Sequence, residues 1–295
     1  MFQNRKGIRT DNILGDVIIW FILILVALAT IYPVFYMFSL SLSDPAAVSE
    51  GKVKVFPVGF SLDAYKFVLS DPRIGQSYLN TILYAGLFCF FSLFFTSLTA
   101  YPLSVDYFSG KRVITILYAI TMFFGGGLVP YYLALKSYRM INTIWVMVIP
   151  GCVSAWNVVI YRTFFRDIPS SLRESAYIDG ANDFVILFAI ILPLSKPLLA
   201  TMALFAIVGK WNDYFNSLLF MTDSNKYPLQ MILRSLVMKV DVSTKETAEL
   251  MSHYKVVPST IRAATIVVAM LPVMCVYPFL QKYFAKGIMI GSIKG

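Results

Sequence analysis

One polar and aromatic cluster interrupts an otherwise apolar run of this sequence. It consists of Lys210, Trp211, Asn212, Asp213, Tyr214 and Asn216. Lys210 and Asp213 lie three positions apart, so they can pair on one face of a helix. Aromatic rings beside amide and carboxylate groups suit a sugar, because its C–H faces stack on rings while its hydroxyls need hydrogen bonds. The same residues would equally suit an aromatic belt with snorkelling charges at a membrane interface.

A second candidate surface follows three consecutive glycines, residues 125–127, in another apolar run. Glycines and the nearby Pro130 break or loosen a helix, which membrane proteins tolerate where the backbone lines a cavity or is buried in protein. The segment is therefore a candidate gate or substrate-lining bend, with Tyr131 and Tyr132 as stacking residues. Close helix–helix packing through small residues is the alternative role for the glycines.

Residues 167–193 form a segment that is polar, then amphipathic, then apolar. Ser171 and Glu174 have the S-x-x-E spacing of a capping box, which predicts a helix start. Gly180 can adopt the left-handed conformation that ends such a helix. One face of the helix is expected to hold Leu172, Ser175 and Ala176. A second helix is expected over residues 184–192, with kinks or entry points at Pro193 and Pro197.

The order of residues in this segment resembles the EAA loop of ATP-binding-cassette importer permeases. The matching residues are Glu174, Ala176, Asp179, Gly180, Ala181 and Leu192–Pro193. In that family the loop lies on the cytoplasmic face and docks into a cleft of the ATPase subunit. The resemblance implies coupling roles for Leu172, Glu174, Ser175, Ala176, Asp179, Gly180 and Ala181. Ser175 departs from the E-A-A core but is also small. A loop helix that packs only on its own bundle is the alternative.

Composition indicates an integral membrane protein. The chain has 295 residues, of which 58% are hydrophobic and 14% charged, with a mean hydropathy of +0.71, and long apolar runs with few charges are typical of membrane spans. The net charge of +9 fits loops near anionic lipid headgroups. Because no basic patch is interleaved with aromatics, no nucleic-acid partner is expected.

The sequence offers no set of residues for catalysis or metal binding. Cys89, Cys152 and Cys275 are well separated and lack C-x-x-C spacing, and His253 is the single histidine, so neither a disulfide framework nor a metal site is indicated. A phosphate-binding G-x-x-x-x-G-K-[ST] loop is absent, as are a Ser/His/Asp set and paired carboxylates. We therefore expect a chain that is not an enzyme and holds no cofactor.

Six apolar runs predict an all-α membrane protein with six transmembrane helices, because about 20 residues cross the hydrocarbon core. The runs are Val17–Leu42, Ser77–Ser104, Val113–Leu135, Ile144–Tyr161, Leu187–Met221 and Pro258–Tyr283. The membrane domain thus spans residues 17–283, with terminal segments 1–16 and 284–295 on one side and long loops 43–76 and 222–257 on the other. The first run is too long for a signal-peptide core, so we expect it to be retained.

The distribution of Lys and Arg between the segments on the two sides gives only a faint preference for one membrane orientation. The EAA-type resemblance implies the orientation instead, because the loop must face an ATPase. On that basis both termini are cytoplasmic, in a multi-pass protein of a bacterial cell membrane.

A wider resemblance covers nearly the whole chain. It rests on the Gly-Gly-Gly-Leu-Val-Pro segment from residue 125, on residues 144–158 and 282–295, and on the trio from Trp211 to Asp213. These are similar to maltose-type sugar importer permeases, and more closely to their oligosaccharide and polysaccharide branch. The resemblance implies a type I importer permease fold. It also implies a homologous second permease, two ATPase subunits that carry ATP and Mg, and an extracellular sugar-binding protein.

Two other functions stay open. An importer of the same type could carry an amino acid or an oxyanion. An anion site would need Lys or Arg in the cavity, and Lys210 is the single candidate in the middle of a run, which weakly favours a neutral solute. A secondary carrier or a membrane enzyme belongs to a different class. Secondary carriers often have inverted repeats and buried acidic ion sites, and the sequence shows neither.

Overall fold

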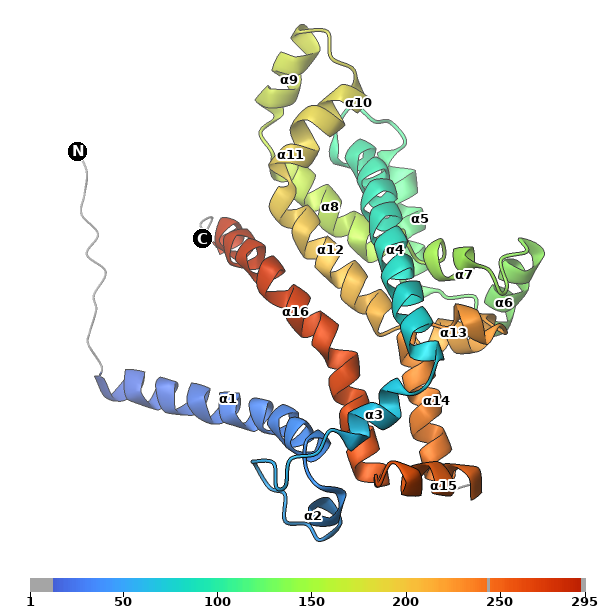
Figure 1. Ribbon diagram of the computed structural model, residues 1–295. Helices are drawn as coiled ribbons and strands as arrows, with labels where there is room; N and C mark the ends of the chain where they lie inside the picture. The colour runs from blue at the N-terminus through green and yellow to red at the C-terminus, as the bar shows by residue number, and fades with distance from the viewer. Residues whose placement is uncertain (1–12, 243–244, 293–295) are drawn as a thin grey trace. The chain divides into compact units, whose positions relative to one another are not determined.

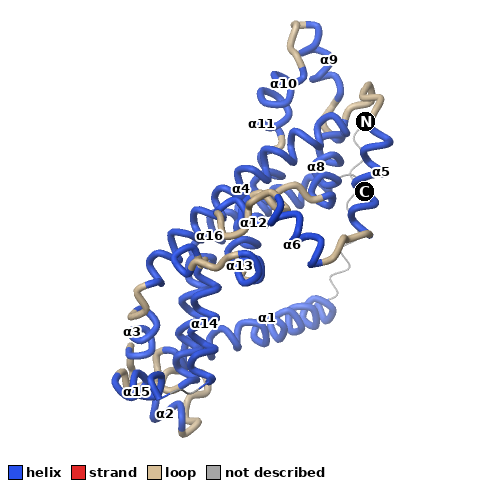
Figure 2. The backbone as a smooth tube through the Cα atoms, turned by 90° about the vertical axis from the view of Figure 1, so that its right-hand side faces the viewer, coloured by secondary structure: helices blue, strands red, loops and turns tan. Residues whose placement is uncertain are grey.

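The computed structural model describes residues 13–242 and 245–292. Within these ranges the regular structure is helical, and the single strand-like feature is an isolated bridge between Ser43 and Phe60 (Figure 2). The all-α prediction is therefore confirmed for the described residues. The chain divides into two compact units, one of residues 1–70 and 239–267 and one of residues 71–238 and 268–295.

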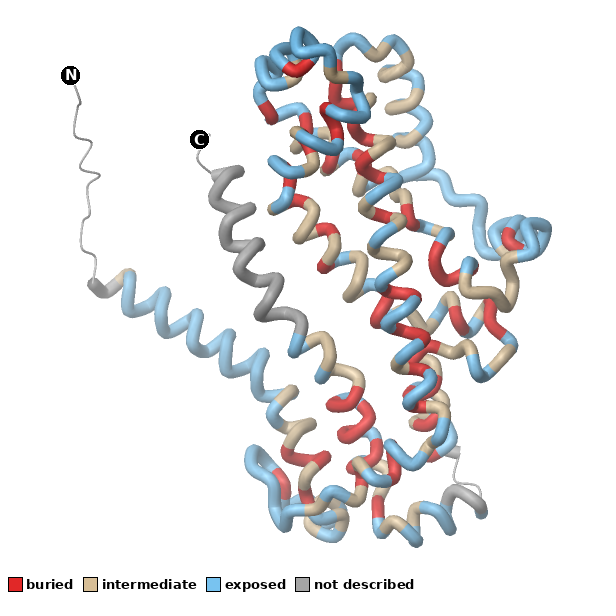
Figure 3. Tube along the Cα trace, turned by 45° about the horizontal axis from the view of Figure 1, so that its top comes forward, coloured by how far each residue is buried: buried red, intermediate tan, exposed pale blue. Residues whose placement is uncertain are grey.

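The first unit contains helix α1, two short helices and α15. Their bounds are α1 (Ile13–Ser41), α2 (Pro45–Ser49), α3 (Asp63–Leu69) and α15 (Lys245–His253). Its small core joins Leu40, Val53 and Ala263, and the Phe67 and Tyr254 rings meet edge to face at 5.7 Å. The apolar first part of α1 is exposed within this chain (Figure 3). An exposed apolar helix of this length suits contact with lipid or with another membrane chain.

The second unit is built around α4 (Arg73–Ser104), which packs mainly against α8 and α12 (Figure 1). Its other helices are α5 (Lys111–Phe123), α6 (Leu128–Ser137), α7 (Ile144–Val148), α8 (Ala155–Asp167), α9 (Ser170–Ile178), α10 (Asp183–Val185), the π-helix η1 (Ile186–Ile191), α11 (Leu192–Leu194), α12 (Lys196–Trp211), α13 (Phe215–Phe220) and the 3₁₀ turn η2 (Ser224–Lys226). Two longer helices, α14 (Leu229–Val242) and α16 (Pro258–Ser292), contribute residues to both units.

Small polar residues let neighbouring helices approach α4 closely. Thr81 and Ser97 are buried, and their hydroxyls donate to backbone carbonyls one turn back, at 2.8 and 2.6 Å. Small polar residues whose hydroxyls hydrogen-bond to the backbone of their own helix are typical of helix interfaces in membranes. The main apolar core lies along the second half of α4 and includes Tyr161, Phe165 and Ile186.

Three described helices are long and apolar enough to cross a membrane: Gly15–Ser41, Arg73–Ser104 and Pro258–Cys275. A fourth counts if the pair Asp183–Leu194 and Lys196–Trp211, bent by 82°, is one span. This bend lies between Pro193 and Pro197, where the sequence predicts kinks. The six-span count stays a prediction.

Glycines explain why two predicted runs are broken into shorter helices. Gly127 has φ +81° between α5 and α6, and Gly151 has φ +76° between α7 and α8. A left-handed residue stops a right-handed helix, and glycine adopts this conformation without steric cost. The expected break at the three glycines is confirmed.

The predicted long loops are largely helical where the structure describes them. Residues 43–76 contain α2, α3 and the start of α4, while residues 222–257 contain α14 and α15. Residues 1–12 and 293–295 lie outside the described residues, so the predicted terminal segments 1–16 and 284–295 are covered only in part.

Candidate functional site

Helix α9 occupies the EAA-like segment and begins directly after Pro169. No side chain caps it, so the predicted capping box is wrong. The helix starts at Ser170, which places Ser171 inside the first turn instead of at the capping position. Proline supplies a fixed φ before a helix, and this start does not depend on the hydroxyl of Ser171.

The other end of α9 has the predicted glycine stop. Gly180 has φ +82°, the N–H of Gly180 donates to the Tyr177 carbonyl at 3.0 Å, and the N–H of Ala181 donates to the Ala176 carbonyl at 2.9 Å. This pair of bonds is the Schellman arrangement. A Cβ on Gly180 would meet no atom within 4 Å, so the backbone conformation alone demands glycine.

The proposed coupling residues divide between two environments. Ala176 is buried in the main core of the second unit, and Ala181 packs against that core. The exposed members are Leu172, Glu174, Ser175, Asp179 and Gly180. Ile178, which the sequence analysis missed, is 86% exposed. The free face of α9 thus carries two apolar side chains, Leu172 and Ile178, among polar neighbours.

The charged cluster at the end of α12 is internally satisfied. Lys210 and Asp213 form a buried ion pair, with 2.8 Å between Lys210 Nζ and Asp213 Oδ2, and the Lys210 ammonium lies 4.7 Å from the centre of the Phe88 ring. The Asn216 side-chain amide donates to Asp213 Oδ2 at 2.7 Å, and the Asn216 backbone N–H donates to Asp213 Oδ1 at 3.2 Å. The predicted pairing is confirmed, and it leaves Lys210 engaged within the protein.

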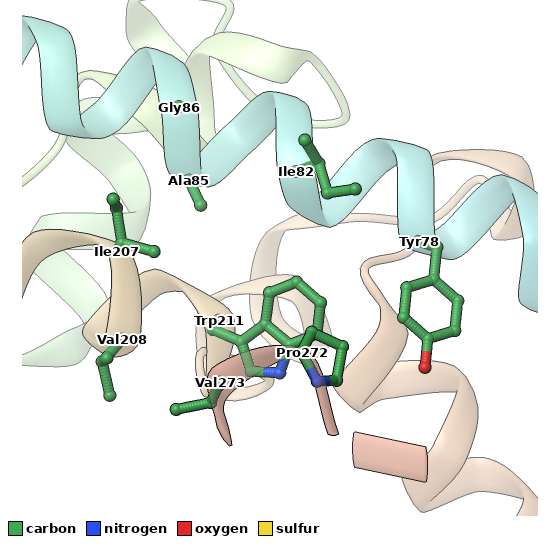
Figure 4. Close-up of a pocket in the computed structure, with 9 residues that line it drawn as sticks. All are labelled: Tyr78, Ile82, Ala85, Gly86, Ile207, Val208, Trp211, Pro272 and Val273. Carbon is green, nitrogen blue, oxygen red and sulfur yellow. The ribbon is translucent and has the colours of Figure 1, made fainter. Parts of the chain in front are cut away.

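The Trp211 ring lies beside Pro272 at the wall of an apolar cavity of about 380 Å³ (Figure 4). The cavity is lined by Tyr78, Ile82, Ala85, Gly86, Ile207, Val208, Trp211, Pro272 and Val273. The indole Nε1–H of Trp211 donates to the Ala269 carbonyl of α16 at 3.0 Å. The polar atom of Trp211 is therefore used inside the protein.

A proline in α16 explains the second polar contact beside this cavity. Pro272 has no N–H, so it cannot donate to the carbonyl of Val268 one turn earlier. The Tyr78 hydroxyl donates to that carbonyl at 2.9 Å. Two aromatic side chains, from α4 and α12, thus bind adjacent carbonyls of α16 at the proline.

A polar and aromatic surface lies where α12 ends, between α12 and α14. The exposed Asn212 accepts from the Gln230 amide at 3.4 Å, and the Arg234 guanidinium lies 4.1 Å from the centre of the Tyr214 ring. Arg234 is exposed. Gln230 and Arg234 were missed by the sequence analysis because they lie in a segment predicted to be a loop.

The structure brings the tyrosines after the glycine bend to α13, which also carries Asn216. Tyr131 meets the Phe220 ring edge to face at 5.6 Å, and Tyr132 stacks on the same ring at 6.1 Å. Tyr131 is 40% exposed. Of the six predicted path residues, Trp211 is buried against α16. The other five lie on or beside α13: Tyr131, Tyr132, Asn212, Asp213 and Asn216.

Among the described residues, no group of three or more His, Cys, Asp or Glu side chains could hold a metal ion. Cys152 is buried and Cys89 is half-buried, and both thiols are free.

Comparison with known proteins identifies the family. The model of the family described as "Binding-protein-dependent transport system inner membrane component" matches residues 87–290. The chain belongs to this family. It is therefore a membrane component of a transport system, and permeases of this family work with a partner permease, ATPase subunits and a substrate-binding protein.

Similar proteins match this permease over nearly its full length. Protein LplC of Bacillus subtilis (strain 168) is 41% identical over 266 residues, which cover 90% of each chain. The polygalacturonan/rhamnogalacturonan transport system permease protein YtcP of the same strain is 39% identical over 284 residues, covering 96% of this chain and 99% of that one.

A solved structure has the same fold. It is the crystal structure of a bacterial ABC transporter involved in the import of the acidic polysaccharide alginate. One of its chains superposes with a TM-score of 0.86 and 35% sequence identity, covering 96% of this chain and 99% of that chain. The permease therefore has the type I ABC importer permease fold that its sequence resembles.

Proposed function

We propose that this chain is the membrane-spanning subunit of an ATP-driven importer for a sugar or oligosaccharide. The observation that carries the proposal is the exposed face of α9, where Leu172 and Ile178 lie uncovered within this chain. Apolar side chains on a short protruding helix suit insertion into a cleft of another protein. In this role α9 docks into an ATPase subunit, and ATP is hydrolysed on that partner with Mg.

The broken helices support six membrane crossings. In this arrangement α5 with α6, α7 with α8, and α10–α11 with α12 each form one crossing, in addition to α1, α4 and α16. The segment that contains α9 then lies on the cytoplasmic side, together with both termini. The segments 43–76 and 222–257 lie outside, where α14 and α15 would contact an extracellular binding protein.

Transport follows from two states of the assembly. Closure of the ATPase pair would displace α9, and the helices would rock between inward-open and outward-open arrangements about a path shared with the second permease. ATP binding can drive this change only because it stabilises one arrangement more than the other.

The substrate path of this subunit lies along the surface around α13. Tyr131 offers a ring for stacking, while Asn212 and Asn216 offer amide groups. Aromatic and amide side chains together are the combination that sugar rings require. Trp211 does not lie on this surface, but its hydrogen bond to the Ala269 carbonyl of α16 holds the end of α12 in place beneath it.

The surface also favours an acidic oligosaccharide, which differs from the neutral solute favoured by the sequence. Lys210 is neutralised by Asp213, but Arg234 is exposed, stacked on Tyr214, and has no carboxylate partner among the described residues. A guanidinium that contacts a ring in this way can still offer N–H donors to a carboxylate. The alginate importer, named for an acidic polysaccharide, is consistent with this class.

The proposal that the substrate is an acidic oligosaccharide is tested by Arg234→Gln in the assembled importer. Uptake of an oligogalacturonate should fall by about tenfold to a hundredfold, since a charge-assisted contact contributes roughly 1.5–3 kcal/mol. Uptake of a neutral malto-oligosaccharide should not fall. Equal transport of the oligogalacturonate by both proteins would refute the role of Arg234.

The docking role of α9 is tested by Gly180→Arg, expressed with the partner subunits. This change should abolish ATPase co-purification and uptake while leaving membrane insertion intact. Gly51→Arg is the matched control, because Gly51 also has a positive φ, +69°, and open space around its Cβ position, yet lies far along the chain from α9. Normal ATPase binding by the Gly180 variant would refute the proposed docking.

A further inference from the structure

Three tyrosine side chains converge on one carboxylate oxygen, Oδ1 of Asp183, between α9 and α4. The hydroxyls of Tyr107 and Tyr177 donate to Asp183 Oδ1 and lie within hydrogen-bond distance of each other. The Tyr101 hydroxyl donates to the same oxygen at 3.1 Å. We call these four residues the Asp183 cluster.

The members of the cluster come from separate parts of the chain. Tyr101 lies in the last turn of α4, Tyr107 in the loop that follows α4, and Tyr177 in the last turn of α9. Asp183 is the first residue of α10, where Asn182 caps the helix by accepting from the Val185 N–H at 2.9 Å. The cluster therefore ties α9 to the end of α4 through side chains that lie up to 82 positions apart.

The apolar core also joins these elements, because it contains Tyr101 and Leu103 of α4 and Ala176 of α9, but a cavity opens beside it. A cavity of about 490 Å³ lies between the end of α4 and α10, with Leu98, Pro102, Phe184 and Leu187 among its lining residues. Three members of the Asp183 cluster, Tyr101, Tyr107 and Asp183, stand at its wall. Where side chains leave a void, contacts across it are lost. The hydrogen bonds of the cluster thus add a polar connection to the apolar one, on the side where the cavity lies.

The chemistry of the cluster suits a fixed joint. The pKa values of the Tyr107 and Tyr177 hydroxyls are raised. The main cause is partial burial, which removes water from the hydroxyls, and the second is the hydrogen bond to the Asp183 carboxylate. Both hydroxyls therefore remain protonated donors at neutral pH. Hydrogen bonds to an ionised acceptor are shorter and stronger than neutral ones.

Stability of the fold depends mainly on the apolar core, to which Tyr101 alone of the Asp183 cluster belongs. The main core below the cluster is apolar and includes Phe165, Ile186 and Ala176. Tyr107 is 60% exposed and Tyr177 39% exposed, so the cluster lies at the rim of this core. Rim hydrogen bonds contribute little to folding because water can replace them.

We propose that Asp183 is a positioning residue that makes α9 and the end of α4 move as one body during transport. The inference rests on the proposed docking of α9 into an ATPase subunit. Without the Asp183 cluster, α9 would remain joined to α12 through α10 and η1 and to the α4 region through the apolar core, but the polar link from Tyr177 to Tyr101 would be lost.

Pulsed electron spin resonance on the assembled importer tests this joint. The native cysteines 89, 152 and 275 are changed to serine, and spin labels are placed at Ser170→Cys on α9 and Ser109→Cys in the loop after α4; both positions are exposed. The distance between the labels should be the same with and without ATP and vanadate. With Asp183→Asn the distance should shift or broaden when ATP and vanadate are added.

Two further variants complete the test, one as a second disruption of the cluster and one as a control. Tyr177→Phe removes a single hydroxyl and should loosen the joint in the same direction, even if the Asp183 variant fails to assemble. Asp106→Asn, whose carboxylate is 91% exposed and paired with Lys111, should behave like the parent protein.

The outcomes separate this inference from the proposed function. Identical label distances in the parent, Asp183→Asn and Tyr177→Phe proteins would overturn the joint, as would a parent distance that itself changes with nucleotide. Failure of the unmutated chain to bind any ATPase subunit would instead overturn the docking of α9.

Discussion

Asp183 and Asp213 each organise a polar cluster, but they draw their partners from different distances along the chain. Asp213 binds Lys210 and Asn216, each three positions away. Asp183 binds Tyr177, six positions away, together with Tyr107 and Tyr101, which are 76 and 82 positions away. The first cluster fixes the local chain where α12 ends, and the second connects separate helices.

The two clusters also differ in burial. The side chains of Lys210 and Asp213 are 8% and 12% exposed, so each charge depends on the other for compensation. The Asp183 cluster lies at a rim that water reaches. We therefore expect changes at Lys210 to reduce stability and changes at Asp183 to affect motion more than stability.

The largest effect is expected from Lys210→Met. Methionine keeps most of the volume but leaves Asp213 buried without its counter-charge, which should cost about 3 kcal/mol of unfolding free energy. The measurement is the denaturation midpoint of the purified protein in detergent.

Lys66→Met is the matched control, because Lys66 also pairs with an aspartate three positions away, Asp63, at 2.8 Å but is 66% exposed. This change should alter stability by less than about 0.5 kcal/mol. Equal losses of stability in Lys210→Met and Lys66→Met would show that burial does not determine the contribution of these ion pairs.

Tyr78→Phe should have an intermediate effect. The ring still fills its place beside the cavity, but the Val268 carbonyl loses the donor that Pro272 cannot replace. A buried acceptor left without a partner costs about 1–3 kcal/mol. A denaturation midpoint equal to that of the parent protein would show that another donor, such as water, serves this carbonyl.

Among the changes within the two clusters and beside the cavity, Asp183→Asn is expected to affect stability least. The amide oxygen still accepts from the tyrosines, and the site is exposed, so the loss should stay below about 1 kcal/mol. A loss as large as that of Lys210→Met would show that the Asp183 cluster serves folding, and the two clusters would then not differ in role.

Local relationships were predictable from the sequence. The Lys210–Asp213 pair, the left-handed stop at Gly180 and the helix break at the three glycines all depend on residues within a few positions of one another. The family resemblance added the fold, which local spacing could not specify.

Relationships over long distances were not predictable in this way. Nothing in the spacing of Tyr101, Tyr107 and Asp183 indicates that they meet, because their contact depends on how α9 packs beside α4. Trp211 was placed in the sugar path because of its neighbours, yet its ring faces α16 (Figure 4). One turn of helix separates a polar surface from an apolar cavity, and only the helix packing decides which way each side chain points.

The helix starts were the least predictable local feature. The spacing of Ser171 and Glu174 fits a capping box, but α9 begins two residues too early for it. Pro169 fixes the backbone before the helix, and this preference outweighs the side-chain cap.

The docking of α9 is tested most directly by a photo-crosslinking amino acid at Ile178, which is 86% exposed. In the assembled importer the account predicts a crosslink to an ATPase subunit, formed from the cytoplasmic side. A crosslink to the extracellular binding protein, or labelling of this position from outside the cell, would contradict it.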